Sequence, residues 1–279
     1  MIGPRRGMVA ALLTTAALAG CTDVSTDPAI PLSLQFDSLP ALAVVVGDTM
    51  RGDSLTPARI PVRAFDGNGG AVSDSLLRVL GIDPSSVQSF RLIPGFRIVG
   101  LRETAAVRIV AQAGALQSQT QTFAVVPPPT GIVRATAVND SIVYDRPDTT
   151  QRDADVSVNV IRQVPDSAAI TLNGLRVRFS VDSFSQNILD SVRLEGTGSP
   201  RPARSAVVVN GAATIRVKAY PRPGATGTGT VRLLVEHVTR GAASAGSPVT
   251  LSVRLLPFRG TSGRITPGTP PLAPARALP

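Results

Sequence analysis

Apolar residues occur at every second position through most of the chain after Pro31. In the first half the alternation runs through residues 32–36, 60–64 and 107–112, and in the second half through residues 156–160, 175–181, 231–235 and 249–255. Because successive side chains of a strand point to opposite faces, each run predicts a half-buried β-strand. No segment has a helical period over three turns. Residues 182–192 come nearest, and we expect at most one short helical turn there.

Glycine, asparagine and aspartate separate the predicted strands. Turn composition is found at Gly47-Asp48, at residues 66–70 and at Ala113-Gly114. Asn210-Gly211 predicts a type I′ turn in a hairpin that joins residues 207–209 to residues 213–219. Short strands at a spacing of about 8–12 residues, with such turns between them, are typical of β-sandwiches.

Three consecutive prolines, Pro127 to Pro129, divide the strand-rich chain. Proline favours an extended backbone, which is typical of a stiff linker. Beyond Phe258 the chain is rich in Gly, Pro and Thr and has no periodicity. The sequence therefore predicts an all-β protein with an immunoglobulin-like sandwich over residues 31–127, a proline linker over residues 128–130, a second sandwich over residues 131–258 and a disordered tail over residues 259–279.

Short motifs support the immunoglobulin-like assignment. The first domain carries Val44 to Thr49, Val62 to Asp66 with Asn68-Gly69, Val99-Gly100 and residues 104–114. This series resembles the bacterial immunoglobulin-like domains. In the second domain, residues 175–181, Asn210 to Thr214 and Thr228 to Val231 are similar to the invasin/intimin-like form, although the long opening segment, residues 131–155, departs from it. The resemblance implies spacers, stalks or adhesive modules without chemistry of their own.

The first 21 residues differ from the rest of the chain. Arg5-Arg6 precede an apolar run from Met8 to Ala19, which is shorter than the roughly 20 residues that a membrane-spanning helix needs. The run ends in Leu18-Ala19-Gly20-Cys21, which resembles a bacterial lipoprotein signal peptide with its lipobox. The resemblance implies cleavage between Gly20 and Cys21 and acylation of the Cys21 thiol. Residues 1–20 would then be the signal peptide, and residues 21–30 a lipidated tether.

Two other export signals remain as alternatives to lipidation. One is an ordinary secretory signal with a cysteine nearby by chance. The other is a twin-arginine signal, although Arg5-Arg6 lacks the flanking residues that this route prefers. The residue after Cys21 is Thr22 rather than an acidic residue, so no inner-membrane retention signal stands there, and we expect the outer membrane, on its periplasmic or surface face.

Composition narrows the classes of partner. The chain is 43% hydrophobic, enough for a core, but it has no Trp, two Tyr and no cysteine besides Cys21, so no disulfide is available. The formal net charge is +9, carried almost entirely by arginine. These arginines are spread along the predicted strands, whereas nucleic-acid modules cluster basic residues among aromatics. We expect no nucleic-acid partner and read the arginines as a solvated sheet face.

Candidate catalytic residues are few. His237 is the single histidine, and we expect a surface position for it near the end of a strand. No G-x-S-x-G motif or phosphate-binding loop is present, and only three glutamates occur. The sequence predicts no enzyme activity, no cofactor and no small-molecule substrate. A hydrolase with an unrecognised site is the least favoured alternative.

Two short features are weak candidates for binding. An acidic segment contains Asp140, Asp145, Asp148, Asp153 and Asp155, whose carboxylates suit calcium, but EF-hand spacing is absent and a solvated loop is the preferred interpretation. Arg51-Gly52-Asp53 matches the integrin-recognition tripeptide on a predicted turn, a match that is frequent by chance.

Together these features predict a lipid-anchored protein of the bacterial cell envelope that acts as a non-enzymatic spacer, adhesion or partner-binding protein. The expected partners are the membrane, through the lipid on Cys21, and an envelope protein or polysaccharide. The alternative is an accessory polysaccharide-binding module, which the shortage of aromatic residues disfavours.

Overall fold

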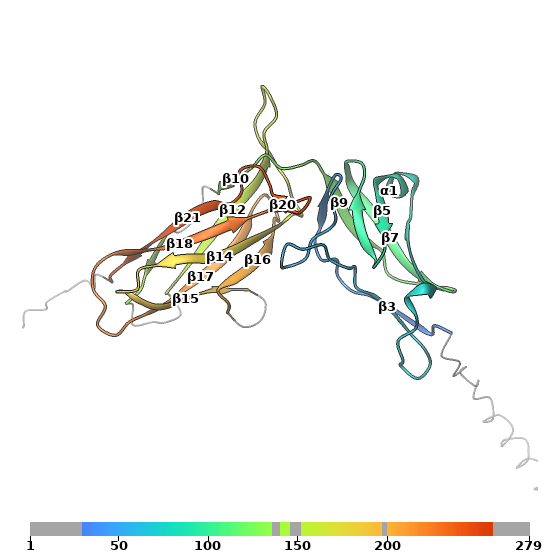
Figure 1. The fold of residues 1–279 in the computed structure, drawn as a ribbon, viewed down its shortest axis with the longest axis horizontal. Coiled ribbons are helices and arrows are strands. Elements are labelled where there is room, and N and C mark those ends of the chain that lie inside the picture. The colour runs from blue at the N-terminus through green and yellow to red at the C-terminus, as the bar shows by residue number, and fades with distance from the viewer. Residues whose placement is uncertain (1–29, 136–139, 146–151, 197–199, 259–279) are drawn as a thin grey trace, which may run out of the picture.

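The computed structural model describes residues 30–135, 140–145, 152–196 and 200–258. These residues form an all-β structure of two immunoglobulin-like sandwiches that lie end to end (Figure 1). Helical structure in the described residues is limited to a 3₁₀ turn, Asp74–Leu76, and one short helix, α1 (Pro84–Ser89). The predicted signal peptide (residues 1–20), Cys21, nearly all of the tether and the predicted tail (residues 259–279) lie outside the described residues.

The first sandwich is built around one four-stranded path. Its strands are β1 (Ser33–Phe36), β2 (Ala43–Val45), β3 (Val62–Phe65), β4 (Leu77–Gly81), β5 (Phe90–Ile93), β6 (Arg97–Gly100), β7 (Thr104–Ala113), β8 (Leu116–Gln117) and β9 (Gln121–Val126). The main sheet has the order β2-β9-β7-β4 with β8 on β7, and the pairs β1-β3 and β5-β6 form separate ladders. The core between them is apolar, and the rings of Phe90 and Phe123 meet edge to face with centroids 5.9 Å apart.

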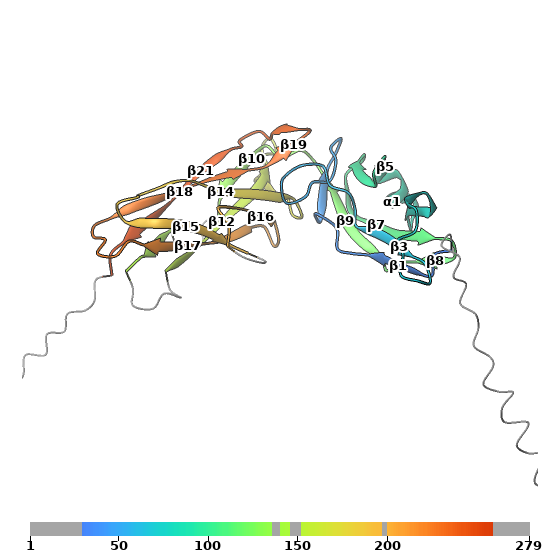
Figure 2. The same cartoon turned by 60° about the horizontal axis from the view of Figure 1, so that its bottom comes forward.

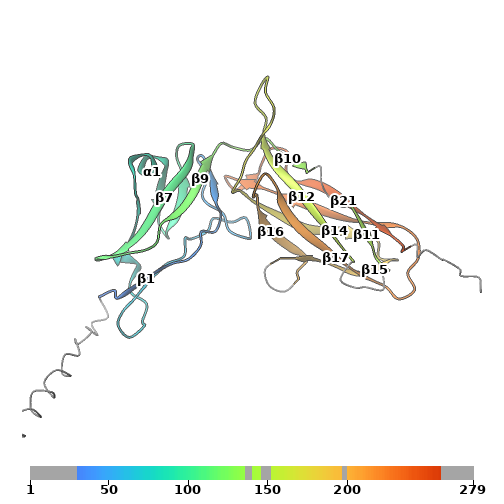
Figure 3. The ribbon, with the colours of Figure 1, turned by 180° about the vertical axis from the view of Figure 1, so that it is seen from behind.

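The second sandwich has two five-stranded sheets. Its strands are β10 (Gly131–Arg134), β11 (Ser141–Val143), β12 (Asp153–Arg162), β13 (Ile170–Thr171), β14 (Arg176–Phe184), β15 (Leu189–Glu195), β16 (Ala203–Val207), β17 (Ala213–Pro221), β18 (Gly229–Glu236) and β21 (Val249–Leu256), with a small pair β19 (Val238–Thr239) and β20 (Ala242–Ala243) beside them. The sheet orders are β10-β12-β17-β15, with β13 on β12, and β11-β21-β18-β14-β16. Figure 3 shows both layers from behind.

In each sandwich the first two strands follow one another along the chain but pair with different ladders. In the first, β1 pairs antiparallel with β3 and β2 then pairs parallel with β9. In the second, β10 pairs antiparallel with β12 and β11 then pairs parallel with β21. The same switch in each unit ties opposite layers together and is the basis of the immunoglobulin-like assignment.

The short turn expected within residues 182–192 is present as a single hydrogen-bonded turn, Ser185 to Leu189, between two strands. β14 continues to Phe184 and β15 begins at Leu189, with a tight turn in which the Ile188 amide donates to the Ser185 carbonyl over 3.0 Å. The pairing of β14 with β18 shifts register between Val181 and Ser183. This irregularity interrupts the alternation, so the sequence pattern there no longer indicates a strand.

Helix α1 was not predicted, because six residues are too few to show a helical period. Its start has a recognisable local signal: the Asp83 carboxylate accepts a hydrogen bond from the Ser86 amide over 2.8 Å, and Pro84 occupies the first turn. The same carboxylate pairs with Arg108 of β7 over 3.0 Å, which fixes the helix to the main sheet.

The turn at Asn210-Gly211 is confirmed, but the hairpin ladder is wrong. Both residues have positive φ, +50° and +91°, and Val209 and Ala212 exchange backbone hydrogen bonds of 2.9 and 3.1 Å. Beyond that bridge the strands separate: β16 pairs with β14, whereas β17 pairs with β12 and β15. The turn therefore carries the chain from one sheet to the other.

Candidate functional site

The two sandwiches meet at β2, which buries both of its faces. Val44 packs in the core of the first sandwich, whereas its neighbours Ala43 and Val45 belong to the core of the second. The contact is close: the Leu42 amide donates to the Gly174 carbonyl over 3.1 Å. Gly174 has φ +80°, and an added Cβ would stand 2.7 Å from the Leu42 carbonyl carbon, so only glycine fits. The junction is thus a continuous apolar contact.

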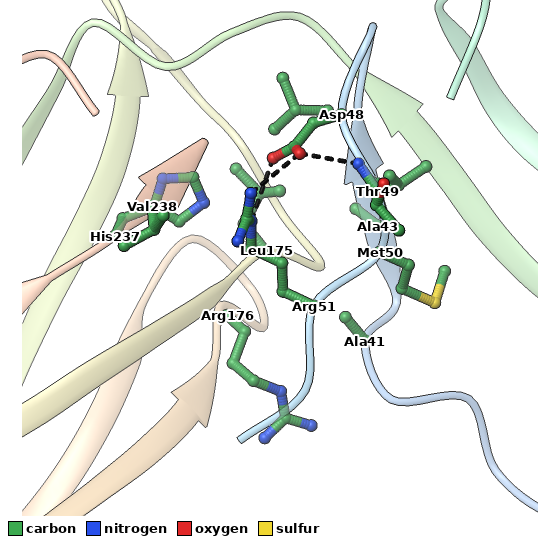
Figure 4. Close-up of a pocket in the computed structure, with 12 residues that line it drawn as sticks. Ala41, Ala43, Asp48, Thr49, Met50, Arg51, Leu175, Arg176, His237 and Val238 are labelled. Atoms are coloured by element: carbon green, nitrogen blue, oxygen red, sulfur yellow. Dashed lines mark hydrogen bonds and ion pairs between the residues drawn. The ribbon is translucent and has the colours of Figure 1, made fainter. Parts of the chain in front are cut away.

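A buried ion pair closes the junction on its polar side. The Asp48 carboxylate accepts hydrogen bonds from Arg51 Nε over 3.1 Å and from Arg51 Nη2 over 2.9 Å, and Arg51 Nη1 donates to the Leu55 carbonyl over 2.7 Å. Only 7% of the Asp48 side chain and 10% of the Arg51 side chain are exposed. Figure 4 shows this pair facing His237 of the second sandwich. This ion pair holds the segment between β2 and β3 in place beside the second sandwich.

The expected surface position of His237 is wrong, because the histidine lies in the junction. It is 3% exposed, and its Nδ1 and Ser244 Oγ are hydrogen-bonded over 2.6 Å. Burial lowers the pKa of His237 to about 4; nearby Asp48 opposes this shift and Arg51 adds to it. The strand pattern could not show this burial, since the segment that covers His237 comes from the other sandwich. A cavity of about 20 Å³ beside it has room for roughly one water molecule.

The tripeptide Arg51-Gly52-Asp53 is part of this junction. It does lie at a turn, and the Leu55 amide donates to the Gly52 carbonyl over 3.0 Å. However, Arg51 is held inside by Asp48, and the Asp53 carboxylate pairs with Arg176 of β14. An arginine bound in this way is not presented to a receptor, so the tripeptide is a structural element here.

Further contacts connect the sandwiches around the apolar centre. Arg176 Nη2 donates to the Pro40 carbonyl, and Arg240 Nη2 donates to the Val46 carbonyl over 3.4 Å. On the surface, Arg162 and Glu103 form an ion pair of 3.2 Å. Figure 2 shows that β19 and β16 of the second sandwich both lie at this end.

A second cavity, of about 300 Å³, lies beside the junction, and we call it the arginine cavity. Its lining is dominated by polar side chains, namely Asp53, Ser54, Arg176, Arg178, Arg201, Arg204 and Ser205, with Gly196 and Ala203. The sequence interpretation of the arginines as one solvated face missed this cluster. Pairing of β14 with β16, which sets Arg178 opposite Ser205, assembles it. No local sequence signal could have found it, because the pairing joins residues far apart in the chain.

The acidic candidates for calcium are mostly paired with arginines. Asp153 and Asp155 both face Arg216, at 3.8 and 3.0 Å from its Nε, and the hydrogen bond that Arg216 donates to Asp155 raises the pKa of Arg216.

The other acidic candidates lie apart from that pair. Asp140 pairs with Arg254 over 3.3 Å, and Asp145 accepts the Phe258 amide. Asp148 lies outside the described residues. Within the described ranges, no three His, Cys, Asp or Glu side chains gather in a way that could hold a metal ion.

The predicted lipidation and cleavage residues, Gly20 and Cys21, lie outside the described residues. Among the residues that are described, no helix is long and apolar enough to cross a membrane.

Comparison with known proteins gives fold-level likeness only. No family model matches the chain, and no curated protein matches it. Among solved structures, domains 4–9 of the surface layer protein SbsC align over 82% of this chain and 32% of that chain, with 12% identity and a TM-score of 0.28. The adhesin InvE of Yersinia pseudotuberculosis aligns over 80% of this chain and 58% of its own, with 11% identity and a TM-score of 0.32.

Enzymes give similar values. A β-glycosidase of Bacteroides vulgatus aligns over 79% of this chain and 24% of its own, with 11% identity and a TM-score of 0.27. In these alignments the chain spans about a third of the SbsC structure and less than three fifths of the InvE structure. Likeness at this level carries no argument about activity, substrate or partner.

Proposed function

We propose that this chain is a lipid-anchored protein of the bacterial cell envelope whose two sandwiches form a stiff, non-catalytic spacer that displays binding surfaces. The acylated Cys21 would hold the chain in a membrane leaflet, the outer membrane being favoured. Two or three acyl chains suffice for firm anchoring, because each buried methylene contributes about 0.8 kcal/mol.

The observation that carries the spacer role is the shared core at the junction. Ala43 and Val45 of the first sandwich are buried with the apolar residues of the second. Exposing a buried valine costs about 1.5 kcal/mol or more. A hinge motion that uncovered Val45 would therefore be unfavourable, even if the ion pairs around the junction stayed intact. A stiff junction follows from that contact.

The direction of the chain also suits a spacer. β1 lies at the end of the first sandwich away from the junction, and β21 runs from the junction toward the far end of the second (Figures 1 and 2). An anchor that precedes Ile30 would therefore hold the second sandwich away from the membrane.

The surroundings of the single histidine support a non-catalytic role. Ser244 is its hydroxyl partner, but Ser244 is 5% exposed and His237 is 3% exposed. A serine nucleophile has to reach a substrate carbonyl, and the cavity beside this pair, of about 20 Å³, admits none. A buried Ser–His pair of this kind stabilises the junction instead.

Distance measurements between spin labels test the stiff spacer. Labels at Ser75→Cys and Gln186→Cys, in a full chain that carries Cys21→Ser, place one probe on each sandwich at exposed positions. We expect one narrow distance distribution. Ala43→Arg drives a long side chain into the junction and should broaden it, whereas Leu42→Arg, at a neighbouring position that is 51% exposed, should not. A broad distribution in the parent chain would contradict the proposal.

A further inference from the structure

Some arginines of the arginine cavity form contacts across the junction, whereas others do not. Of its four arginines, Arg176 is held by Asp53 and by the Pro40 carbonyl. Arg178 and Arg201, in contrast, make no side-chain hydrogen bond or ion pair with any described residue. Glu236 stands opposite Arg178 in the β14–β18 ladder but forms no ion pair with it in the described structure. Two guanidinium groups are thus available to a ligand.

The donors in the cavity suit an oxyanion. Each guanidinium offers planar, parallel N–H groups that match a carboxylate or phosphate, and it keeps its charge at any physiological pH. The hydroxyls of Ser54 and Ser205 add hydrogen-bonding groups beside them. The cavity is open to solvent, because Ser54 and Arg201 are exposed and 85% of the Asp53 side chain is accessible. Its volume, about 300 Å³, is at the lower end of the range for small-ligand sites.

We propose that the arginine cavity binds an acidic sugar unit of an anionic polysaccharide. The inference rests on the binding role proposed above and names the chemical class of the partner. Arg178 and Arg201 would bind the acid group, and the serine hydroxyls would bind the sugar hydroxyls. Asp53 is the one carboxylate in the lining, and it opposes the binding of an anion.

The lining argues against other partners with acidic groups. A protein interface is centred on buried aromatic or large apolar side chains, and the lining has neither. Binding of single-stranded nucleic acid relies on aromatic side chains for base stacking, which are equally absent from the cavity. Ala203, Arg204 and Ser205 of β16 line the cavity. Figure 2 shows β16 toward the junction, away from the end of the first sandwich where the described chain begins, so the cavity does not face a membrane that holds that end.

Calorimetric titration of the full chain carrying Cys21→Ser, without detergent and at a fixed salt concentration of about 0.1 M, tests the inference. The probes are polygalacturonate, neutral dextran, inorganic phosphate, single-stranded DNA and anionic lipid vesicles. We expect binding of polygalacturonate and none of dextran. Arg178→Gln and Arg201→Gln should each weaken that binding about tenfold, the usual effect of losing a charged hydrogen bond.

Two further variants separate a site from general charge. Arg232→Gln removes the same charge from an exposed position of β18, outside the cavity, and should leave the affinity within about twofold. Asp53→Asn should strengthen binding about threefold, because the opposing carboxylate charge is lost. Unfolding temperatures of all variants would show that the fold is intact.

Three results would overturn the inference: no binding of polygalacturonate, an equal loss in Arg232→Gln, or tighter binding of DNA or vesicles with the same dependence on Arg178. Binding of phosphate alone would reduce the site to an adventitious ion only and would also overturn it. Because mass spectrometry of the amino terminus tests the lipid anchor separately, failure of the glycan site and failure of the anchor are distinguishable.

Discussion

At the scale of single residues, burial lowers the pKa of His237. The folded chain holds it at a pKa of about 4, whereas an unfolded histidine has a pKa of about 6.5. Between these values the unfolded chain binds more protons than the folded one. The contribution of the neutral, buried His237 to the free energy of unfolding is therefore fully present above pH 6.5. It decreases as the pH falls and is lost below about pH 4.

His237→Gln should remove this part of the pH dependence. Because the side chain is almost fully buried, we expect the free energy of unfolding of the parent chain to fall by roughly 2 kcal/mol more than that of the variant between pH 7 and pH 5. Urea unfolding at the two pH values measures the difference. Carboxylates such as Asp83, whose pKa is held low by hydrogen bonds from Ser85 and Ser86, contribute equally to both proteins. Parallel pH profiles would show that His237 is not buried as a neutral ring.

At the scale of elements, β2 connects the two cores. Three consecutive buried residues in a strand mean that both faces are covered, and here each face is covered by a different sandwich. The close approach of Gly174 to Leu42 is what allows this arrangement. The junction therefore depends on a glycine whose neighbours in sequence give no hint of its partner.

Gly174→Ala and Gly224→Ala form a matched pair that isolates this contact. Both glycines have positive φ, +80° and +73°, but an added Cβ at position 224 meets no atom within 4 Å. Each change imposes backbone strain of about 1 kcal/mol. Gly174→Ala should destabilise the chain by about 2 kcal/mol more, because its Cβ meets backbone atoms. Equal unfolding free energies for the two variants would mean that the Leu42 contact is looser than described.

The strands could be predicted from the sequence because they depend on local alternation. The run at residues 107–112 lies in β7, the run at residues 175–181 lies in β14 from Arg176 onward, and their apolar members face the cores. The type I′ turn at Asn210-Gly211 is equally local. The departures are not local: His237 is covered by the other sandwich, and the arginine cavity forms only when β16 pairs with β14. A pattern with a period of two specifies faces, but not what lies against them.

For the whole molecule, we propose an anchor at Cys21, a stiff pair of sandwiches and a basic cavity at their junction that binds a ligand. The formal net charge of +9 favours contact with anionic surfaces in general. The cavity concentrates part of that charge at one place, beside the apolar core that the two units share. A rigid junction would keep the cavity preorganised for its ligand.

Mass spectrometry of the mature amino terminus tests the central claim, that this is a lipid-anchored display protein, most directly. The protein is purified from the membrane fraction of the cells that make it, beside a Cys21→Ser variant. We predict a chain that begins at Cys21 and carries a diacylglyceryl group on its thiol, and a variant that is neither cleaved at this bond nor acylated. An unmodified Cys21, or cleavage at another bond, would contradict the account.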